Sequence, residues 1–328
     1  MFKETKIAAG RQKQFCTECG KELKEIGEPL KYERDTGLPI YEMICPTEGC
    51  KKPVLDHSFG GLLEGSMKSI LASGSIIETG VPYFDDPAGG MTRGELTSIG
   101  GRPGHGKSTI MLNILDSMAR KGLKILLFNR ELSNAAALNK LLVMNNPYVT
   151  YTQVRHRVLS DTVVIELKKT AEEIKEIYKN VIMYDDIRDL NESVAAIKKY
   201  EPDVFIDDYI QLIRVGGPRQ ERRFDIEEVM HEYKWVAKKT NSAGLLISQL
   251  SRDVEKRLDH TPMMGDFAEG GTIEQASENA VFIQHPFSFD PMRYGPETSE
   301  IIFKKCRYGK VGTYRLKFLG EKCKFEAM

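Results

Sequence analysis

Short apolar runs alternate along this chain with segments whose apolar residues recur every three or four positions. The apolar runs are typical of buried strands, and they cover residues 95–99, 124–128, 181–184, 203–209 and 244–249. Helical spacing follows over residues 108–115, 191–200 and 226–239. Strands that alternate with helices predict an α/β fold with a mainly parallel, twisted sheet flanked by helices. Ligands of such folds bind at the carboxyl ends of the strands.

Composition narrows the choice of function only slightly. The 328 residues contain 47 basic and 47 acidic side chains, so the chain lacks the overall positive charge that would by itself indicate nucleic-acid binding. Equal numbers of basic and acidic side chains still allow a local basic surface. No apolar run is long enough to span a membrane, and residues 1–6 lack the apolar stretch of a signal peptide. We therefore expect a soluble cytoplasmic protein with no membrane partner.

Residues 101–108 read G-R-P-G-H-G-K-S and match the P-loop pattern at every fixed position. A strand pattern precedes them and a helical pattern follows, as a P-loop requires. Backbone N–H groups of such a loop hold phosphates, its lysine reaches the β and γ oxygens, and its serine coordinates Mg²⁺. We expect ATP and Mg²⁺ to bind at Gly101, Arg102, Pro103, Gly104, His105, Gly106, Lys107, Ser108 and Thr109. The alternative is a glycine-rich turn that contains a lysine by chance.

Polar side chains follow three of the other strand patterns, at Glu131, at the pair Asp207 and Asp208, and at Gln249. Parallel strands bring such ends to one edge of the sheet, so we expect Lys107, Glu131, Asp208 and Gln249 to converge. Glu131 would then orient and deprotonate an attacking water, and Gln249 would sense the γ-phosphate. Carboxylates at strand ends also cap helices. Capping and supporting roles are the ones that we expect for Asp185, Asp186 and Asp207.

Four cysteines near the N-terminus are paired as C-x2-C and C-x4-C, and they are Cys16, Cys19, Cys45 and Cys50. Four thiolates at this spacing predict a structural zinc ribbon, which leaves no open coordination position for catalysis. Two short strand patterns at residues 31–34 and 40–44, with a turn at 35–37, fit a hairpin between the pairs. Unrelated surface thiols are the alternative, and His57 is a substitute ligand that we consider less favourable. Cys306 and Cys323 lack this spacing and are expected to be ordinary residues.

These motifs divide the chain into three parts. Residues 1–57 are expected to form the zinc-ribbon module, and residues 79–328 the ATPase domain. The linker at residues 58–78 carries an apolar pattern that predicts an amphipathic docking helix, at Leu62, Leu63, Met67, Ile70 and Leu71.

Several longer segments carry a resemblance to a known family. They are residues 79–96, the P-loop, residues 128–133 (F-N-R-E-L-S), residues 206–212 (I-D-D-Y-I-Q-L), residues 248–257 (S-Q-L-S-R-D-V-E-K-R), residues 266–275 (D-F-A-E-G-G-T-I-E-Q) and residues 304–312 (K-K-C-R-Y-G-K-V-G). In this order they resemble the C-terminal motor domain of DnaB-like replicative helicases, which are RecA-like P-loop ATPases. The likeness covers about residues 78–325.

This resemblance implies a RecA-like core that binds ATP and Mg²⁺ between subunits of a homo-oligomeric ring, expected to be a hexamer, or of an open helical assembly. It aligns Asp208 with the metal-associated aspartate. It implies that Lys305 and Arg307 reach the ATP site of the next subunit, where an arginine stabilises transition-state charge. It places four residues in loops that contact single-stranded DNA, namely Arg252, Glu269, Gly270 and Gly271. The implied activity is ATP-dependent DNA unwinding in replication, with 5′ to 3′ polarity.

Two features depart from the family pattern. Ala268 stands where relatives commonly carry an arginine, which removes one expected phosphate contact. The zinc-ribbon pattern stands where the helical N-terminal domain of the family is expected, which puts the usual docking of a loader or primase in doubt. Primase, polymerase and helicase loader therefore stay candidate partners.

Two other functions fit the same residues. A RadA-like recombination ATPase also joins a four-cysteine ribbon to a RecA-like core and drives branch migration. A nonenzymatic adaptor would use the ribbon to bind a primase or polymerase, with nucleotide as a structural switch.

Overall fold

The computed structural model describes residues 24–32, 39–44, 75–216, 222–268 and 271–328. Two compact units divide the chain, Met1–Ser73 and Gly74–Met328. In the first unit, strands β1 (Lys24–Tyr32) and β2 (Pro39–Ile44) pair antiparallel, with Lys24 opposite Ile44 and Tyr32 opposite Pro39. The expected antiparallel pairing of two strands is confirmed, although the first strand begins and ends earlier than the predicted residues 31–34, and the predicted turn at 35–37 lies outside the described residues. The four N-terminal cysteines and the apolar linker pattern lie outside the described residues.

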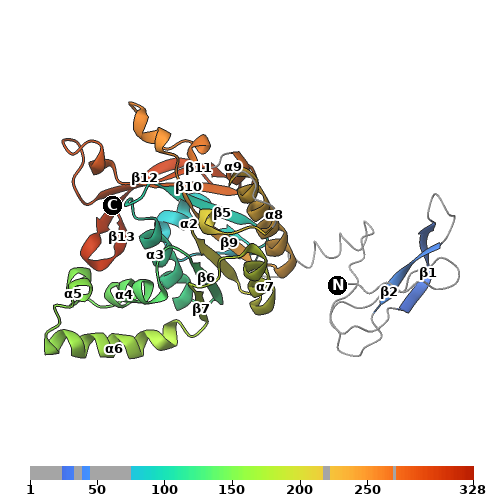
Figure 1. Ribbon diagram of the computed structural model, residues 1–328, viewed down its shortest axis with the longest axis horizontal. Coiled ribbons are helices and arrows are strands. Elements are labelled where there is room, and N and C mark those ends of the chain that lie inside the picture. The colour runs from blue at the N-terminus through green and yellow to red at the C-terminus, as the bar shows by residue number, and fades with distance from the viewer. Residues whose placement is uncertain (1–23, 33–38, 45–74, 217–221, 269–270) are drawn as a thin grey trace. The chain divides into compact units, whose positions relative to one another are not determined.

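The second unit is built on one nine-stranded sheet in the described residues, with the strand order β13-β12-β11-β10-β5-β9-β8-β6-β7 (Figure 1). Strands β10, β5, β9, β8, β6 and β7 are mutually parallel, and β11, β12 and β13 extend the sheet antiparallel. The strands are β5 (Leu96–Gly101), β6 (Ile125–Asn129), β7 (Val181–Tyr184), β8 (Val204–Asp208), β9 (Ala243–Gln249), β10 (Asn279–Gln284), β11 (Thr298–Cys306), β12 (Gly312–Leu319) and β13 (Lys324–Ala327). A short pair, β3 (Ile76–Ile77) with β4 (Met91–Thr92), precedes them.

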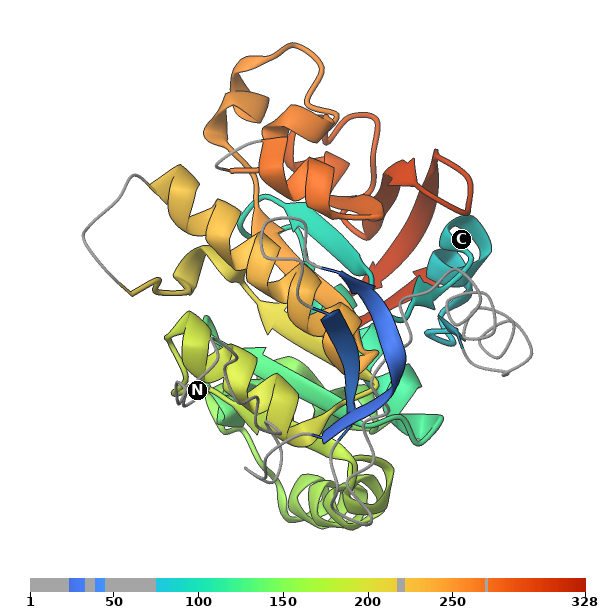
Figure 2. The same ribbon diagram turned by 90° about the vertical axis from the view of Figure 1, so that its right-hand side faces the viewer.

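Helices cover both faces of this sheet. Helices α2 (Pro82–Ala88), α3 (Lys107–Arg120) and α4 (Asn134–Met144) pack on one face, and α7 (Leu190–Tyr200), α8 (Arg222–Thr240) and α9 (Gly271–Ala276) pack on the other. The long helix α8 lies across its face of the sheet in Figure 2. None of the helices in the described ranges has the length and apolar character needed to cross a bilayer.

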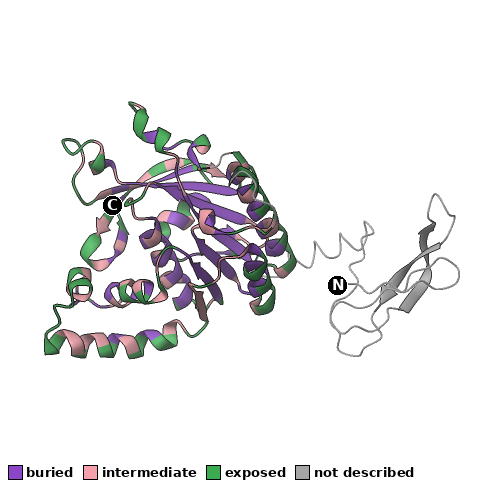
Figure 3. Ribbon diagram, in the orientation of Figure 1, coloured by how far each residue is buried: buried purple, intermediate pink, exposed green. Residues whose placement is uncertain are grey.

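The alternation of side chains along the strands explains these two layers. In β6, Ile125 and Leu127 enter the core beneath α3, whereas Leu126 and Phe128 enter the core beneath α8. Because both faces of this strand are buried, its first four residues form a continuous apolar run, which the buried Asn129 ends. The strands form the buried centre of the unit (Figure 3). The expected α/β fold with a mainly parallel sheet is therefore confirmed.

Two parts of the fold were absent from the sequence-based expectation. Helices α4, α5 (Tyr151–His156) and α6 (Asp161–Ile177) lie between β6 and β7. Strands β10 and β11 were not predicted as a pair, although β11 and β12 form the hairpin expected around residues 304–312. Helix α6 is largely exposed, and only Thr170 and Ile174 are buried. Its apolar residues do recur at helical spacing, as clearly as those of α7, so the pattern was present in the sequence and was overlooked.

Candidate active site

The P-loop connects β5 to α3. Gly104 and Gly106 adopt φ angles of 82° and 92°, in the left-handed region that favours glycine. A methyl group added at Gly106 would lie 2.6 Å from a ring carbon of Phe325, so both backbone and space demand glycine there. Helix α3 begins at Lys107, as the motif predicted.

Lys107 is buried, and its Nζ donates to the carbonyl oxygen of Arg102 at 3.1 Å. Burial lowers the pKa of this lysine, while the negative charges of Glu131 and Asp208 raise it. A desolvated ammonium favours an anionic group that would satisfy its remaining donors, and the two carboxylates beside it favour a cation that accompanies that anion. Phosphate has that chemistry.

Strands β6 and β8 bring Glu131 and Asp208 together. Asn129 of β6 lies opposite Asp208 of β8, and the backbone N–H of Glu131 donates to the Asp208 carbonyl oxygen at 3.2 Å. The Glu131 side chain is exposed, whereas Asp208 is fully buried. One carboxylate therefore faces solvent beside another that is held inside.

The Asp208 carboxylate is a buried group without a hydrogen-bond partner within normal distance for either oxygen. Burial raises its pKa to about 6, the nearby Ser108 hydroxyl lowers that pKa, and the charge of Glu131 raises it further. The amide of Asn129, also buried at this edge, is unpaired as well. Buried polar atoms are normally satisfied, so this cluster fits a bound Mg²⁺ with its water ligands.

The raised pKa of Asp208 has a consequence for stability. A carboxyl whose pKa is about 6 in the folded chain and 3.8 when unfolded opposes folding once it ionises, so stability falls as pH rises from 4 to 6. Asp208→Asn is therefore expected to stabilise the nucleotide-free chain by up to about 3 kcal/mol at pH 7, with almost no effect at pH 4. Urea denaturation at the two pH values measures this. Equal stabilisation at both would refute the assignment.

Gln249 lies at the end of β9, opposite Gly101 of the P-loop. Its backbone N–H donates to Oε1 of Gln211 at 3.2 Å, and its carbonyl oxygen accepts from the Ala268 N–H at 3.0 Å. A cleft of about 490 Å³ opens here between the P-loop and the segments after β9; its lining includes Arg102, Gln249, Arg252 and Ala268. The predicted phosphate sensor thus lies between the P-loop and the predicted DNA-facing segment.

The two predicted DNA-facing segments are paired with each other. Leu250 forms a β-bridge with Phe267, and the Ser251 N–H donates to the Asp266 carbonyl oxygen at 2.8 Å. Arg252 begins the short helix η2 (Arg252–Lys256) and is exposed. Gly271 begins α9 and is also exposed. Glu269 and Gly270 lie outside the described residues.

Lys305 and Arg307 lie far from the P-loop of their own subunit. The Arg307 backbone N–H donates to the carbonyl oxygen of Glu278, which lies beside Leu96 at the first residue of β5, whereas the P-loop follows the last residue of that strand. The length of this six-residue strand separates the two places by roughly 16 Å. Nζ of Lys305 donates to the Glu274 carbonyl oxygen at 2.7 Å. Neither side chain completes the P-loop of its own chain.

A buried ion pair that no sequence pattern indicated supports this edge of the sheet. Arg130 donates to both oxygens of Asp207, at 2.8 and 2.7 Å, and both side chains are fully buried. The Tyr233 hydroxyl donates to Asp207 at 2.5 Å, and Arg130 also donates to the Ser193 hydroxyl at 2.9 Å. Arg130 and Asp207 are the neighbours of Glu131 and Asp208, so the pair fixes the backbone of both.

Removing one partner of this pair is expected to lower the free energy of unfolding strongly. Asp207→Ala leaves the Arg130 charge buried without its partner, which costs about 3–5 kcal/mol of unfolding free energy. Lys175→Ala is the matched control, because Lys175 pairs with Glu172 where both side chains are largely exposed, and it should cost less than about 1 kcal/mol. Chemical denaturation compares the two, and similar losses would contradict this structural role.

Most of the chain matches a known protein family. Residues 76–327 match the family described as the DnaB-like helicase C terminal domain. The chain belongs to this family. The match to the DnaB-like family therefore covers almost all of the second unit, Gly74–Met328, and lacks only residues 74, 75 and 328.

Individual DnaB relatives agree with this assignment. The chain is 29% identical over 265 residues to the replicative DNA helicase DnaB of Buchnera aphidicola subsp. Acyrthosiphon pisum (strain APS), and 29% identical over 257 residues to the replicative DNA helicase DnaC of Bacillus subtilis (strain 168). Each alignment covers 76% of this chain and 56% of the relative. The chain thus spans about half the length of the curated relatives it matches.

Solved structures confirm the RecA-like fold of the DnaB family. A solved ATPase domain superposes with a TM-score of 0.74 at 24% identity, covering 83% of this chain and 99% of that one. A DnaB-like replicative helicase studied with its primase interactions gives a TM-score of 0.70 at 24% identity, covering 82% and 66%.

Proposed function

We propose that this protein is an ATP-dependent DNA helicase that acts on single-stranded DNA as a ring-shaped oligomer in replication. The observation that carries the proposal is the convergence of Lys107, Glu131, Asp208 and Gln249 at one sheet edge, in a chain of the DnaB-like family. Membership supports ATP, Mg²⁺ and single-stranded DNA as ligands. A 5′ to 3′ polarity is part of the proposal.

Each residue has a distinct part in hydrolysis. P-loop backbone groups and Lys107 bind and neutralise the phosphates, while Ser108 and Asp208 hold the metal. Mg²⁺ would supply positive charge that offsets the negative charge of the phosphates. Glu131 accepts the proton of the attacking water, for which its exposed position is suited. The Gln249 side-chain amide donates to the γ-phosphate and relays its loss to Ala268 through the backbone contact.

Lys305 and Arg307 are proposed to act on the ATP site of the neighbouring subunit. Both residues lie toward the end of the sheet where β5 begins, whereas the P-loop follows the end of β5. Neither side chain reaches the P-loop of its own chain, which supports action between subunits. The Arg307 side chain is 59% exposed and bonds Glu278 at 3.3 Å, a weak contact that a phosphate can replace. A hexamer is the ring that we propose.

DNA contact is proposed for Arg252 and for Glu269, Gly270 and Gly271. Arg252 is exposed at the cleft beside Gln249, which suits a phosphate contact. Ala268 contributes no charge to this surface. Primase, polymerase or a helicase loader are proposed as further partners, and the cytoplasm as the location.

The test is ATP turnover and fork unwinding by the full chain, with and without single-stranded DNA, on 5′-tailed and 3′-tailed substrates. Helicase function predicts DNA-stimulated turnover and unwinding of the 5′-tailed fork. Preference for branched recombination intermediates would favour the RadA-like alternative. Nucleotide binding without any DNA-stimulated turnover would favour the adaptor.

Zinc is proposed as a ligand of Cys16, Cys19, Cys45 and Cys50, on their spacing alone. No cluster of three or more candidate metal-binding side chains occurs within the described ranges, which exclude these cysteines. The purified chain is expected to contain about one zinc per molecule, and Cys16→Ser with Cys19→Ser should remove it. Elemental analysis measures the content. Cys306→Ser with Cys323→Ser is the control, and loss of zinc only in that control would overturn the assignment.

A further inference from the structure

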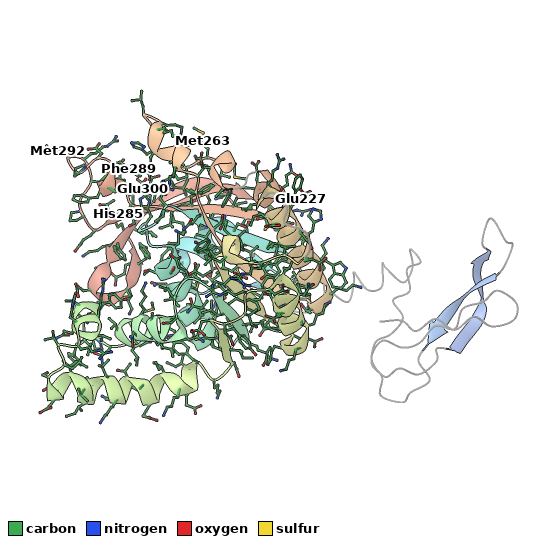
Figure 4. The ribbon with its side chains drawn as sticks, in the orientation of Figure 1. Glu227, Met263, His285, Phe289, Met292 and Glu300 are labelled. Carbon is green, nitrogen blue, oxygen red and sulfur yellow. The ribbon has the colours of Figure 1, made fainter. Side chains whose placement is uncertain are left out.

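An aromatic cluster joins the P-loop to two later segments of the chain, at His260 and at Phe289. The ring of His105 meets Phe289 edge-on, with centroids 5.5 Å apart, and His260 stacks on Phe289 at 4.3 Å with 22° between the ring planes. Phe289 follows the short helix η4 (Pro286–Ser288), which continues from β10. Three segments distant in sequence therefore meet at one phenyl ring. Figure 4 labels Phe289 and its neighbour His285 on one side of the domain.

His105 is held in a defined orientation within this cluster. Its Nδ1 accepts from the backbone N–H of His285 at 3.4 Å. Burial is the first cause that lowers its pKa, to about 4, so the ring is neutral at pH 7 and keeps Nδ1 as an acceptor. His105 lies between Gly104 and Gly106, the two P-loop glycines with left-handed backbone, so its ring is attached to the part of the loop where phosphate is expected to bind.

The other end of the cluster leads to the DNA-facing segment. His260 belongs to the turn at residues 257–263, and from this turn Arg257 donates to both oxygens of Asp266, at 3.1 and 2.6 Å. The Met263 N–H donates to the same carboxylate at 2.6 Å. Asp266 immediately precedes Phe267 and Ala268, which lead into the predicted DNA contacts.

We propose that Phe289 is a positioning residue that transmits nucleotide occupancy from His105, through His260 and Arg257, to Asp266 and the two residues that follow it, Phe267 and Ala268. This deepens the proposed function and rests on it. The route is separate from the direct backbone contact between Gln249 and Ala268. Arg102 makes other contacts with the near end of the same segment, at Glu255 and the Leu250 carbonyl oxygen, and Nδ1 of His260 lies 3.2 Å from the Val254 carbonyl oxygen, where the two sets of contacts meet.

The first experiment needs only nucleotide. Hydrogen exchange of the full chain is measured with and without the non-hydrolysable analogue adenylyl imidodiphosphate and Mg²⁺. In the wild type, nucleotide is expected to slow exchange in both residues 250–256 and residues 257–263. Phe289→Ala should abolish the effect in 257–263 and leave it in the P-loop and in residues 250–253, which Arg102 contacts at Leu250. An unchanged nucleotide effect in 257–263 would overturn the proposal.

A matched control lies in the same turn. Phe287 is partly buried and contacts the ring of His285 at 6.0 Å, and it forms no ring contact with His105 or His260. Phe287→Ala should keep the wild-type response, and Phe289→Tyr should restore it. A response lost equally in both alanine variants would mean general loosening of the turn and would also overturn the proposal.

The second experiment measures the coupling itself. The affinity for a labelled oligothymidine is compared with and without the same analogue, and the ratio is the coupling factor. An aromatic contact of this kind corresponds to about a two- to tenfold change in an equilibrium constant, so Phe289→Ala should reduce the factor by that amount. Adding His260→Ala should reduce it no further. If the wild type binds no oligothymidine, the proposed function fails. The hydrogen-exchange experiment still tests whether Phe289 carries the effect of nucleotide to residues 257–263, because it needs no DNA.

Discussion

Arg307→Ala is expected to lower DNA-stimulated ATP turnover by about 10³-fold or more, because an arginine supplied to the γ-phosphate stabilises charge that forms only in the transition state. Nucleotide affinity should change little, since that charge is absent from the ground state. Arg315→Ala is the control. Arg315 lies on the same hairpin and is 60% exposed, against 59% for Arg307. Steady-state turnover of the assembled protein is the measurement.

Mixing two inactive variants tests whether Arg307 acts on a neighbouring subunit or on its own. A subunit with Arg307→Ala keeps Glu131, and a subunit with Glu131→Gln keeps Arg307. In a random equimolar mixture, about a quarter of the heterologous interfaces unite an intact Glu131 with an intact Arg307. Activity should therefore reappear when two inactive variants are combined. No recovery in assemblies that demonstrably exchange subunits would refute the trans assignment.

Glu131→Gln is expected to lower the hydrolysis rate by about 10²–10⁴-fold, because the amide cannot take a proton from the attacking water. Nucleotide binding should survive, since Lys107 and the P-loop are untouched. A nucleotide-binding assay beside single-turnover hydrolysis separates the two effects. Asp186→Asn is the matched control at the end of the neighbouring strand β7, and it should retain turnover. Wild-type hydrolysis by Glu131→Gln would remove Glu131 from the catalytic role.

The sequence predicted which residues meet at the candidate site better than it predicted the contacts that hold them in place. Continuous apolar runs mark β6, β8 and β9 because both faces of these strands are buried, so the residues at their ends could be assigned to one edge. The structure brings Glu131 next to Asp208 by a backbone hydrogen bond, as a shared sheet edge requires. The catalytic roles themselves stay predictions.

The contacts that support the site could not be predicted, because they join residues from elements far apart in the sequence. Arg130 pairs with Asp207 of β8 and contacts Tyr233 of α8, and no local period records such a meeting. Phe289 likewise sits in an irregular turn, where neither strand nor helix spacing applies. The strand order of the sheet had to be known before either contact could be recognised.

Arg307 and the P-loop lie at opposite ends of β5, so the proposed action of Arg307 on a neighbour would give each subunit a head and a tail. A row of subunits joined in this way leaves its first member without a donor and its last without a recipient, so an open row always has one working site fewer than its subunits. Closure into a ring removes that deficit. Turnover per subunit should therefore increase with the length of the assembly and reach its maximum only when the ring is closed.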